Sequence, residues 1–227
     1  MAEDPHYLGH RARLRERFQK GGPDALADYE LLELYLYQAL PRRDVKPVAK
    51  LLLARFGGLG GVLGASEDAL AGVKGVGSVA AQALKVAHAL STRALRERVD
   101  KRTIIGSWDA LLDYCRAHMA HNATEQFRVL FLDVKNGLIS DEVQQEGTIN
   151  HVQLYPREVV GRALALGAAA VILVHNHPSG DPTPSAADIE MTKQVASAGK
   201  PLGVTVHDHL IIGRDGHASF RALGLIG

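Results

Sequence analysis

The chain has 227 residues, of which 46% are hydrophobic and 22% are charged, and its formal net charge is +1. This length allows two modest domains of about 100–150 residues each. A single cysteine, Cys115, excludes an internal disulfide and favours a reducing compartment, with a packing role for its thiol. No signal peptide opens the sequence and its longest apolar stretch contains glycine, so we expect a cytoplasmic protein without membrane contact.

The charge is distributed unevenly along the chain. Residues 1–102 carry 17 Lys and Arg against 12 Asp and Glu, whereas the remainder carries 9 against 13. The basic residues gather in an expected N-terminal helix (Arg11, Arg13, Arg15, Arg17, Lys20) and before a linker (Arg93, Arg96, Arg98, Lys101, Arg102). Such clusters can attract nucleic-acid phosphates, but a solvated helical face explains them at least as well. Charge alone therefore does not predict a DNA-binding protein.

The first part of the chain, residues 1–100, predicts a small all-helical domain. Residues 29–39 and 44–56 have amphipathic helical spacing, and residues 70–85 predict a helix, a Gly-x-Gly turn and a second helix. This pattern resembles a helix-hairpin-helix, in which the glycines and the opening amides of the second helix approach phosphate. The candidate DNA contacts are Lys74, Gly75, Gly77 and Ser78. A helix–helix turn that only packs fits these residues equally well.

The second part, residues 104–227, predicts an α/β domain with a mixed sheet flanked by helices, after a linker at residues 98–103. Helical spacing over residues 108–120 is followed by strand-like runs at 127–134 and 137–145. The remaining expected elements are a helix at 156–167, a buried strand at 168–174 that leads into His175, a helix at 185–198 and terminal strands that include 210–212.

A metal-site pattern follows the expected buried strand. His175 and His177 end this strand at alternate positions and should therefore share one face. Proline and glycine residues then force a turn, after which Ser185 predicts a helix N-cap and Asp188 lies in the first helical turn. The Ser185-x-x-Asp188 pair alone is more typical of capping, and the histidines alone are about as often incidental. Together they predict a zinc site with three protein ligands and one position for water.

These residues resemble the motif of the JAMM (MPN+) metalloprotease superfamily, which is a distant Glu, then His-x-His, seven residues and Ser-x-x-Asp. The wider string HNHPSGDPTPSAAD and the later DHLIIG resemble the bacterial RadC family, and this similarity covers nearly the whole chain. The resemblance implies one zinc ion held by His175, His177 and Asp188. It also implies that Ser185 hydrogen-bonds near the bound water and the oxyanion.

The resemblance further implies an upstream Glu at the junction of the domain's first helix and the following strand. Glu125 fits this position best and is the expected general base. The alternatives are Glu142 and Glu146, in or after the next strand, and Glu158, which follows Pro156 in a first helical turn and complements the helix dipole there.

Two further residues are candidates for orienting a metal ligand. Asp208 and His209 run into the strand at 210–212, and either could hydrogen-bond to a ligand. A buried Asp–His contact at the entry to a strand is equally consistent with the sequence.

Three functional classes follow from these patterns. The first is a zinc-dependent peptidase or isopeptidase that acts on a peptide or an isopeptide-linked protein. The second is a DNA-associated hydrolase or repair accessory of the RadC type, and the third is a non-catalytic, zinc-stabilised binding module. The complete ligand pattern and a candidate base favour the first.

Overall fold

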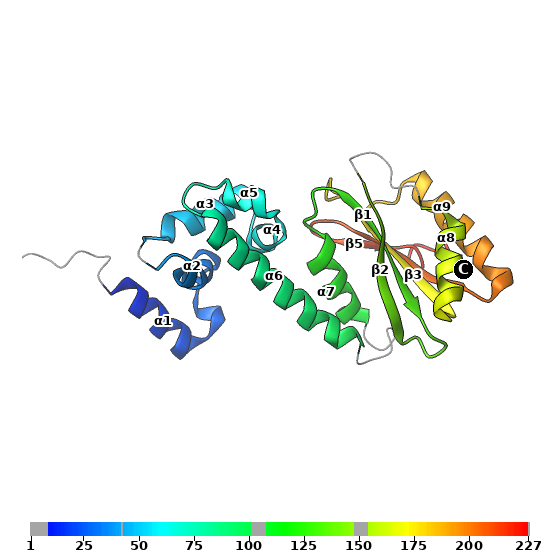
Figure 1. The fold of residues 1–227 in the computed structure, drawn as a ribbon, viewed down its shortest axis with the longest axis horizontal. Helices are drawn as coiled ribbons and strands as arrows, with labels where there is room; N and C mark the ends of the chain where they lie inside the picture. Colours follow the sequence, from blue (N-terminus) through cyan, green and yellow to red (C-terminus); the bar gives the residue numbers. More distant parts are fainter. Residues whose placement is uncertain (1–8, 42, 101–107, 148–153, 227) are drawn as a thin grey trace, which may run out of the picture. The chain divides into compact units, whose positions relative to one another are not determined.

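The computed structural model describes residues 9–41, 43–100, 108–147 and 154–226, and the chain divides into two compact units, residues 1–89 and 90–227. The first unit is helical and the second contains one mixed sheet with helices (Figure 1). This confirms the predicted fold class.

The helical unit is built around a leucine core. It comprises α1 (His10–Gly21), a short 3-10 helix (Pro23–Ala25), α2 (Asp28–Ala39), α3 (Lys46–Phe56), α4 (Leu59–Gly64), α5 (Glu67–Ala71) and the first part of α6 (Gly77–Asp100). Five of these helices each contribute a leucine that is at most 1% exposed: Leu14, Leu36, Leu52, Leu70 and Leu84. The amphipathic spacing of the sequence therefore corresponds to one shared core.

Helix α6 is longer than the sequence suggested. It runs without interruption for 24 residues to Asp100, so residues 98–100 of the expected linker are helical. Residues 101–103 lie outside the described part of the chain. The helix continues because its last two turns contain neither glycine nor proline and are rich in good helix formers.

The second unit has a five-stranded sheet. Its elements are α7 (Trp108–Met119), β1 (Glu125–Leu132), β2 (Leu138–Gly147), α8 (Pro156–Leu166), β3 (Ala170–Asn176), α9 (Ala186–Gly199), a 3-10 helix (Lys200–Leu202), β4 (Thr205–Ile212) and β5 (His217–Ser219). The strand order is β2-β1-β3-β4-β5, in which β3 and β4 are parallel and the other neighbours are antiparallel. Helix α9 makes the crossover that parallel strands require.

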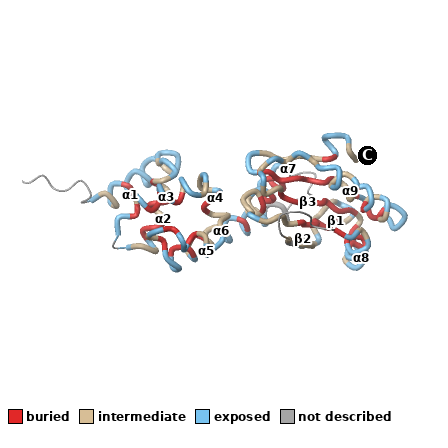
Figure 2. The backbone as a smooth tube through the Cα atoms, turned by 90° about the horizontal axis from the view of Figure 1, so that it is seen from above, coloured by how far each residue is buried: buried red, intermediate tan, exposed pale blue. Residues whose placement is uncertain are grey.

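Helices cover both faces of this sheet (Figure 1), and β1 and β3 between them are largely buried (Figure 2). Helix α7 packs on one face against residues such as Ile172, and α8 and α9 pack on the other against residues such as Leu173. Cys115 of α7 is completely buried, and burial raises the pKa of its thiol to about 12, in agreement with a packing role. Among the described residues, no helix is long and apolar enough to cross a lipid bilayer. Because side chains alternate along a strand, each residue of β3 packs either against α7 or against α8 and α9.

Candidate metal centre

Strand β3 brings the two histidines of the motif together. His175, the penultimate residue of β3, is completely buried and stacks against Phe127 of β1 with 5.5 Å between ring centroids. The amide of His177 donates to the carbonyl of Ile212 at 3.0 Å, which extends the β3–β4 pairing beyond the end of β3. The Nε2 atoms of His175 and His177 are 3.0 Å apart. The prediction that both histidines share one face is confirmed.

The turn after β3 returns Asp188 to the histidines. The Ser185 hydroxyl accepts from the Asp188 amide at 3.2 Å, and the Asp188 carboxylate accepts from the Ser185 amide at 2.8 Å, which makes a capping box at the start of α9. The same carboxylate lies 3.3 Å from Nε2 of His175 and 3.7 Å from Nε2 of His177. The sequence presented helix capping and metal binding as alternative roles. In the structure, Asp188 is placed so that it can perform both.

The three side chains form a donor set that fits zinc. Among the described residues, this is the group of His, Cys, Asp or Glu whose candidate ligand atoms all lie within 4.8 Å of one another. Zinc bonded to imidazole nitrogen and carboxylate oxygen at about 2.0–2.2 Å keeps its ligand atoms within about 4.4 Å of each other. The separations of 3.0, 3.3 and 3.7 Å satisfy this limit.

The hydrogen bonds of His177 show which of its nitrogen atoms is available to a cation. Its Nδ1 lies 2.8 Å from the carbonyl oxygen of Asp181, which can only accept. Nδ1 therefore carries the hydrogen of the neutral ring, and Nε2 presents a lone pair to His175 and Asp188.

The charge states of the cluster suit a dication. Burial lowers the pKa of His175 to about 4, and the adjacent Asp188 carboxylate raises the pKa of His177. Burial alone would raise the pKa of Asp188, but the interactions with His177, His175 and Ser185 outweigh it and hold that pKa below the usual range. At neutral pH the cluster thus contains a carboxylate and a neutral, buried imidazole, which is the ligand chemistry that zinc prefers.

Glu125 lies beside this cluster. It begins β1, which pairs antiparallel with β3 so that Phe127 stands opposite His175. Two residues earlier, Glu125 is on the same face and at the level of His177, because side chains alternate along a strand. Its charge also contributes, after that of Asp188, to the raised pKa of His177. The predicted junction of α7 and β1 is confirmed, whereas the role of Glu125 as a base stays a prediction.

Two of the three alternatives to Glu125 have other partners or positions. Glu142, in the middle of β2, accepts hydrogen bonds from Arg162 at 2.7–3.1 Å and from Ser140 at 2.9 Å. Glu158 is exposed in the first turn of α8, where its charge complements the helix dipole as expected. The side chain of Glu146 lies outside the described residues.

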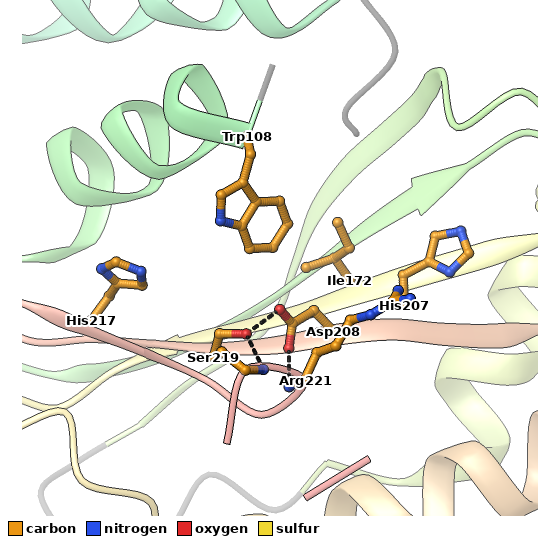
Figure 3. Close-up of a pocket in the computed structure, with 8 residues that line it drawn as sticks. Trp108, Ile172, His207, Asp208, His217, Ser219 and Arg221 are labelled. Carbon is orange, nitrogen blue, oxygen red and sulfur yellow. Dashed lines mark hydrogen bonds between the residues drawn. The ribbon is translucent and has the colours of Figure 1, made fainter. Parts of the chain in front are cut away.

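His209 and Asp208 separate onto opposite faces of the sheet. Completely buried His209 contacts the cluster, with Nε2 at 2.8 Å from Nδ1 of His175. Asp208 instead faces α7, where its carboxylate accepts from the Ser219 hydroxyl at 2.5 Å and the Arg221 amide at 2.9 Å (Figure 3). The expectation that Asp208 orients a metal ligand is therefore corrected. Strand alternation allows only one of two consecutive residues to face the site.

Thr192 of α9 is a site residue that the sequence did not reveal. It is completely buried, and its hydroxyl lies 2.6 Å from Nδ1 of His209 and 2.6 Å from the carbonyl oxygen of Asp188. The available signal was its position four residues after Asp188, which places both on one side of a helix.

Two protein-family models match this chain. Residues 105–225 match the RadC-like JAB domain, and residues 7–82 match the UPF0758 N-terminal domain. The first match alone covers more than half of the sequence. The chain belongs to the RadC family. The JAB-domain match agrees with the helix-flanked mixed sheet of this RadC protein and with its cluster of two histidines and an aspartate.

The N-terminal match of this RadC protein includes the predicted Gly-x-Gly turn. The turn connects α5 to α6, with φ values of 97° at Gly75 and 66° at Gly77. A Cβ atom at Gly75 would lie 2.9 Å from a methyl group of Val48, so this glycine is required for packing against α3. Lys74 and Ser78 are exposed. A turn with two glycines joins two helices as expected, whereas the helix-hairpin-helix assignment and contact with DNA stay predictions.

Proposed function

We propose that this protein is a zinc-dependent hydrolase that cleaves an amide bond in a peptide or between isopeptide-linked proteins. The observation that carries the proposal is the convergence of Nε2 of His175, Nε2 of His177 and the Asp188 carboxylate within 3.0–3.7 Å, with Glu125 on the same face of the sheet. Three protein ligands leave the fourth zinc position open for water, and a separate carboxylate beside it can act as a base.

The residues divide the chemistry between them. When bound, zinc supplies a Lewis acid and lowers the pKa of its water ligand to about 7. Glu125 accepts a proton from the attacking water, whose oxygen forms a bond to the substrate carbonyl carbon. Glu125 then gives this proton to the leaving nitrogen as the carbon–nitrogen bond breaks, so that the carboxylate is regenerated.

Ser185 has a second role in this scheme. Its hydroxyl donates to Oδ2 of Asp188 at 2.6 Å, and its amide donates to the same oxygen at 2.8 Å. The hydroxyl can therefore turn toward the oxyanion of the substrate while the amide continues to hold Asp188. A donor that gains its partner only in the transition state contributes directly to the rate.

The choice of an amide over a phosphate ester rests on the JAMM resemblance and the JAB-domain match, because a metal cluster by itself supports either reaction. The substrate is accordingly assigned by class only. It is an amide carbonyl that can reach Glu125 and the metal position at one end of the sheet.

The test compares Glu125→Gln with the matched control Glu142→Gln in zinc-loaded, full-length protein. The probes are a library of internally quenched peptides and a peptide pair joined through a lysine side chain. We expect Glu125→Gln to keep its zinc and to lose at least about 100-fold in kcat, because general-base catalysis contributes about that much or more. Glu142→Gln should retain both zinc and turnover, since the Glu142 carboxylate is hydrogen-bonded to Arg162.

Wild-type turnover in Glu125→Gln would exclude this residue as the base. Zinc binding without cleavage of any probe by the wild type would instead support the third class, a non-catalytic zinc-stabilised module.

A further inference from the structure

A chain of hydrogen bonds runs behind the metal ligands and joins two of them. It begins at the backbone carbonyl of Asp188, 2.6 Å from the Thr192 hydroxyl, which is 2.6 Å from Nδ1 of His209. Nε2 of His209 then lies 2.8 Å from Nδ1 of His175. Thr192, His209 and His175 are all 0% exposed, so water does not compete for these groups.

The chain has one consistent direction. A carbonyl oxygen can only accept, so the Thr192 hydroxyl donates its single hydrogen to Asp188 and must accept from His209. Nδ1 of His209 therefore carries the hydrogen of this neutral, buried ring, and its Nε2 accepts from Nδ1 of His175. The remaining nitrogen of His175, Nε2, is left with a lone pair that faces Nε2 of His177 at 3.0 Å.

We propose that Thr192 and His209 are positioning residues through which the backbone carbonyl of Asp188 fixes the tautomer of His175 and so presents its Nε2 to the metal. The inference rests on the proposed metal site. It adds to that site the claim that the main-chain carbonyl of one ligand, Asp188, determines the tautomer of another ligand, His175. Because Asp188 supplies both the carboxylate and the carbonyl, the first turn of α9 sets two ligands at once.

Removal of the Thr192 hydroxyl should release this control. In Thr192→Val a methyl group replaces the acceptor for Nδ1 of His209, and a buried donor without a partner is unfavourable. The ring can avoid this by moving its hydrogen to Nε2, which reverses the next bond and puts the hydrogen of His175 on its own Nε2. That hydrogen would occupy the metal-facing position. Zinc affinity should fall by about 10- to 100-fold, the usual effect of losing a partner behind a ligand.

The experiment uses full-length protein and two measurements. Zinc competition against a chromophoric chelator gives the affinity of the wild type, Thr192→Val, Thr192→Ser and the control Thr92→Val, which changes another buried threonine in α6. Imidazole ¹⁵N NMR of the metal-free proteins identifies the hydrogen-bearing nitrogen of His175 and His209.

We expect both rings to carry hydrogen on Nδ1 in the wild type and in Thr192→Ser, which keeps the hydroxyl. Thr192→Val alone should shift this hydrogen to Nε2 and weaken zinc binding. Wild-type zinc affinity in Thr192→Val, or hydrogen on Nε2 of His209 in the wild type, would overturn the inference. The NMR result does not depend on turnover, so an inactive protein with the expected tautomers would contradict the proposed function and leave this inference intact.

Discussion

His177 is the residue at which a proton and a metal ion compete most directly. The Asp188 carboxylate raises the pKa of His177 above the ordinary value of 6.5, and Nδ1 already carries the hydrogen that Asp181 accepts. The additional proton must therefore occupy Nε2, the proposed ligand atom. Burial lowers the pKa of His175 to about 4, so that ring is neutral throughout the range in which His177 titrates.

We predict that zinc affinity is highest at pH values above the pKa of His177 and that it decreases as the pH falls through this pKa. Only the neutral ring can bind zinc, and the loss should approach about tenfold per pH unit once His177 is mostly protonated. Competition titrations between about pH 8 and about pH 6, corrected for protonation of the chelator, measure this dependence. An affinity that stays constant over this range would show that His177 does not bind the metal through Nε2.

At the scale of elements, the loop that connects His177 to Asp188 is held against the turn between β4 and β5. The carbonyl of Gly180 accepts from the Arg214 amide at 3.1 Å, next to the bond between His177 and Ile212. A Cβ atom on Gly213 would lie only 2.3 Å from the Gly180 oxygen. The position of the loop that connects His177 to Asp188 thus depends on a glycine more than 20 residues away in the sequence.

Gly213→Ala should therefore displace the loop and weaken zinc binding by about tenfold or more, as for other losses of support behind a ligand. Overpacking should also lower the free energy of unfolding by about 1–3 kcal/mol. The matched control is Gly216→Ala in the same turn, where the new Cβ would meet Pro182 at an ordinary 3.9 Å. Chelator competition and denaturant unfolding of both variants measure the two effects. Equal zinc affinity in the two variants would contradict the proposed dependence on Gly213.

The elements nearest the site were the most predictable from sequence. The apolar run before His175 and the Ser185 N-cap are local signals, and both elements formed where expected. Strand β1 begins two residues earlier than predicted, because the polar residues Glu125 and Gln126 join the sheet by pairing with β2. Long-range strand pairing also decides that His209, and not Asp208, faces the cluster. No local pattern contains this information.

At the scale of the whole molecule, the sequence indicated a basic helical part followed by an acidic α/β part, and the structure contains both. The division into compact units falls between residues 89 and 90, inside α6. Composition could not locate this position, because the helix continues through it without glycine or proline. The two family matches, to residues 7–82 and 105–225, lie on either side of this division.

The metal is the central claim, and elemental analysis of the purified full-length protein tests it most directly. Wild type, His175→Ala, Asp188→Ala and the control His217→Ala should be compared after dialysis against a trace of zinc. We predict about one zinc per chain in the wild type and in His217→Ala, whose imidazole is bonded to Arg116 outside the cluster, and none in the other two variants. A folded wild-type protein that takes up no zinc would contradict the account.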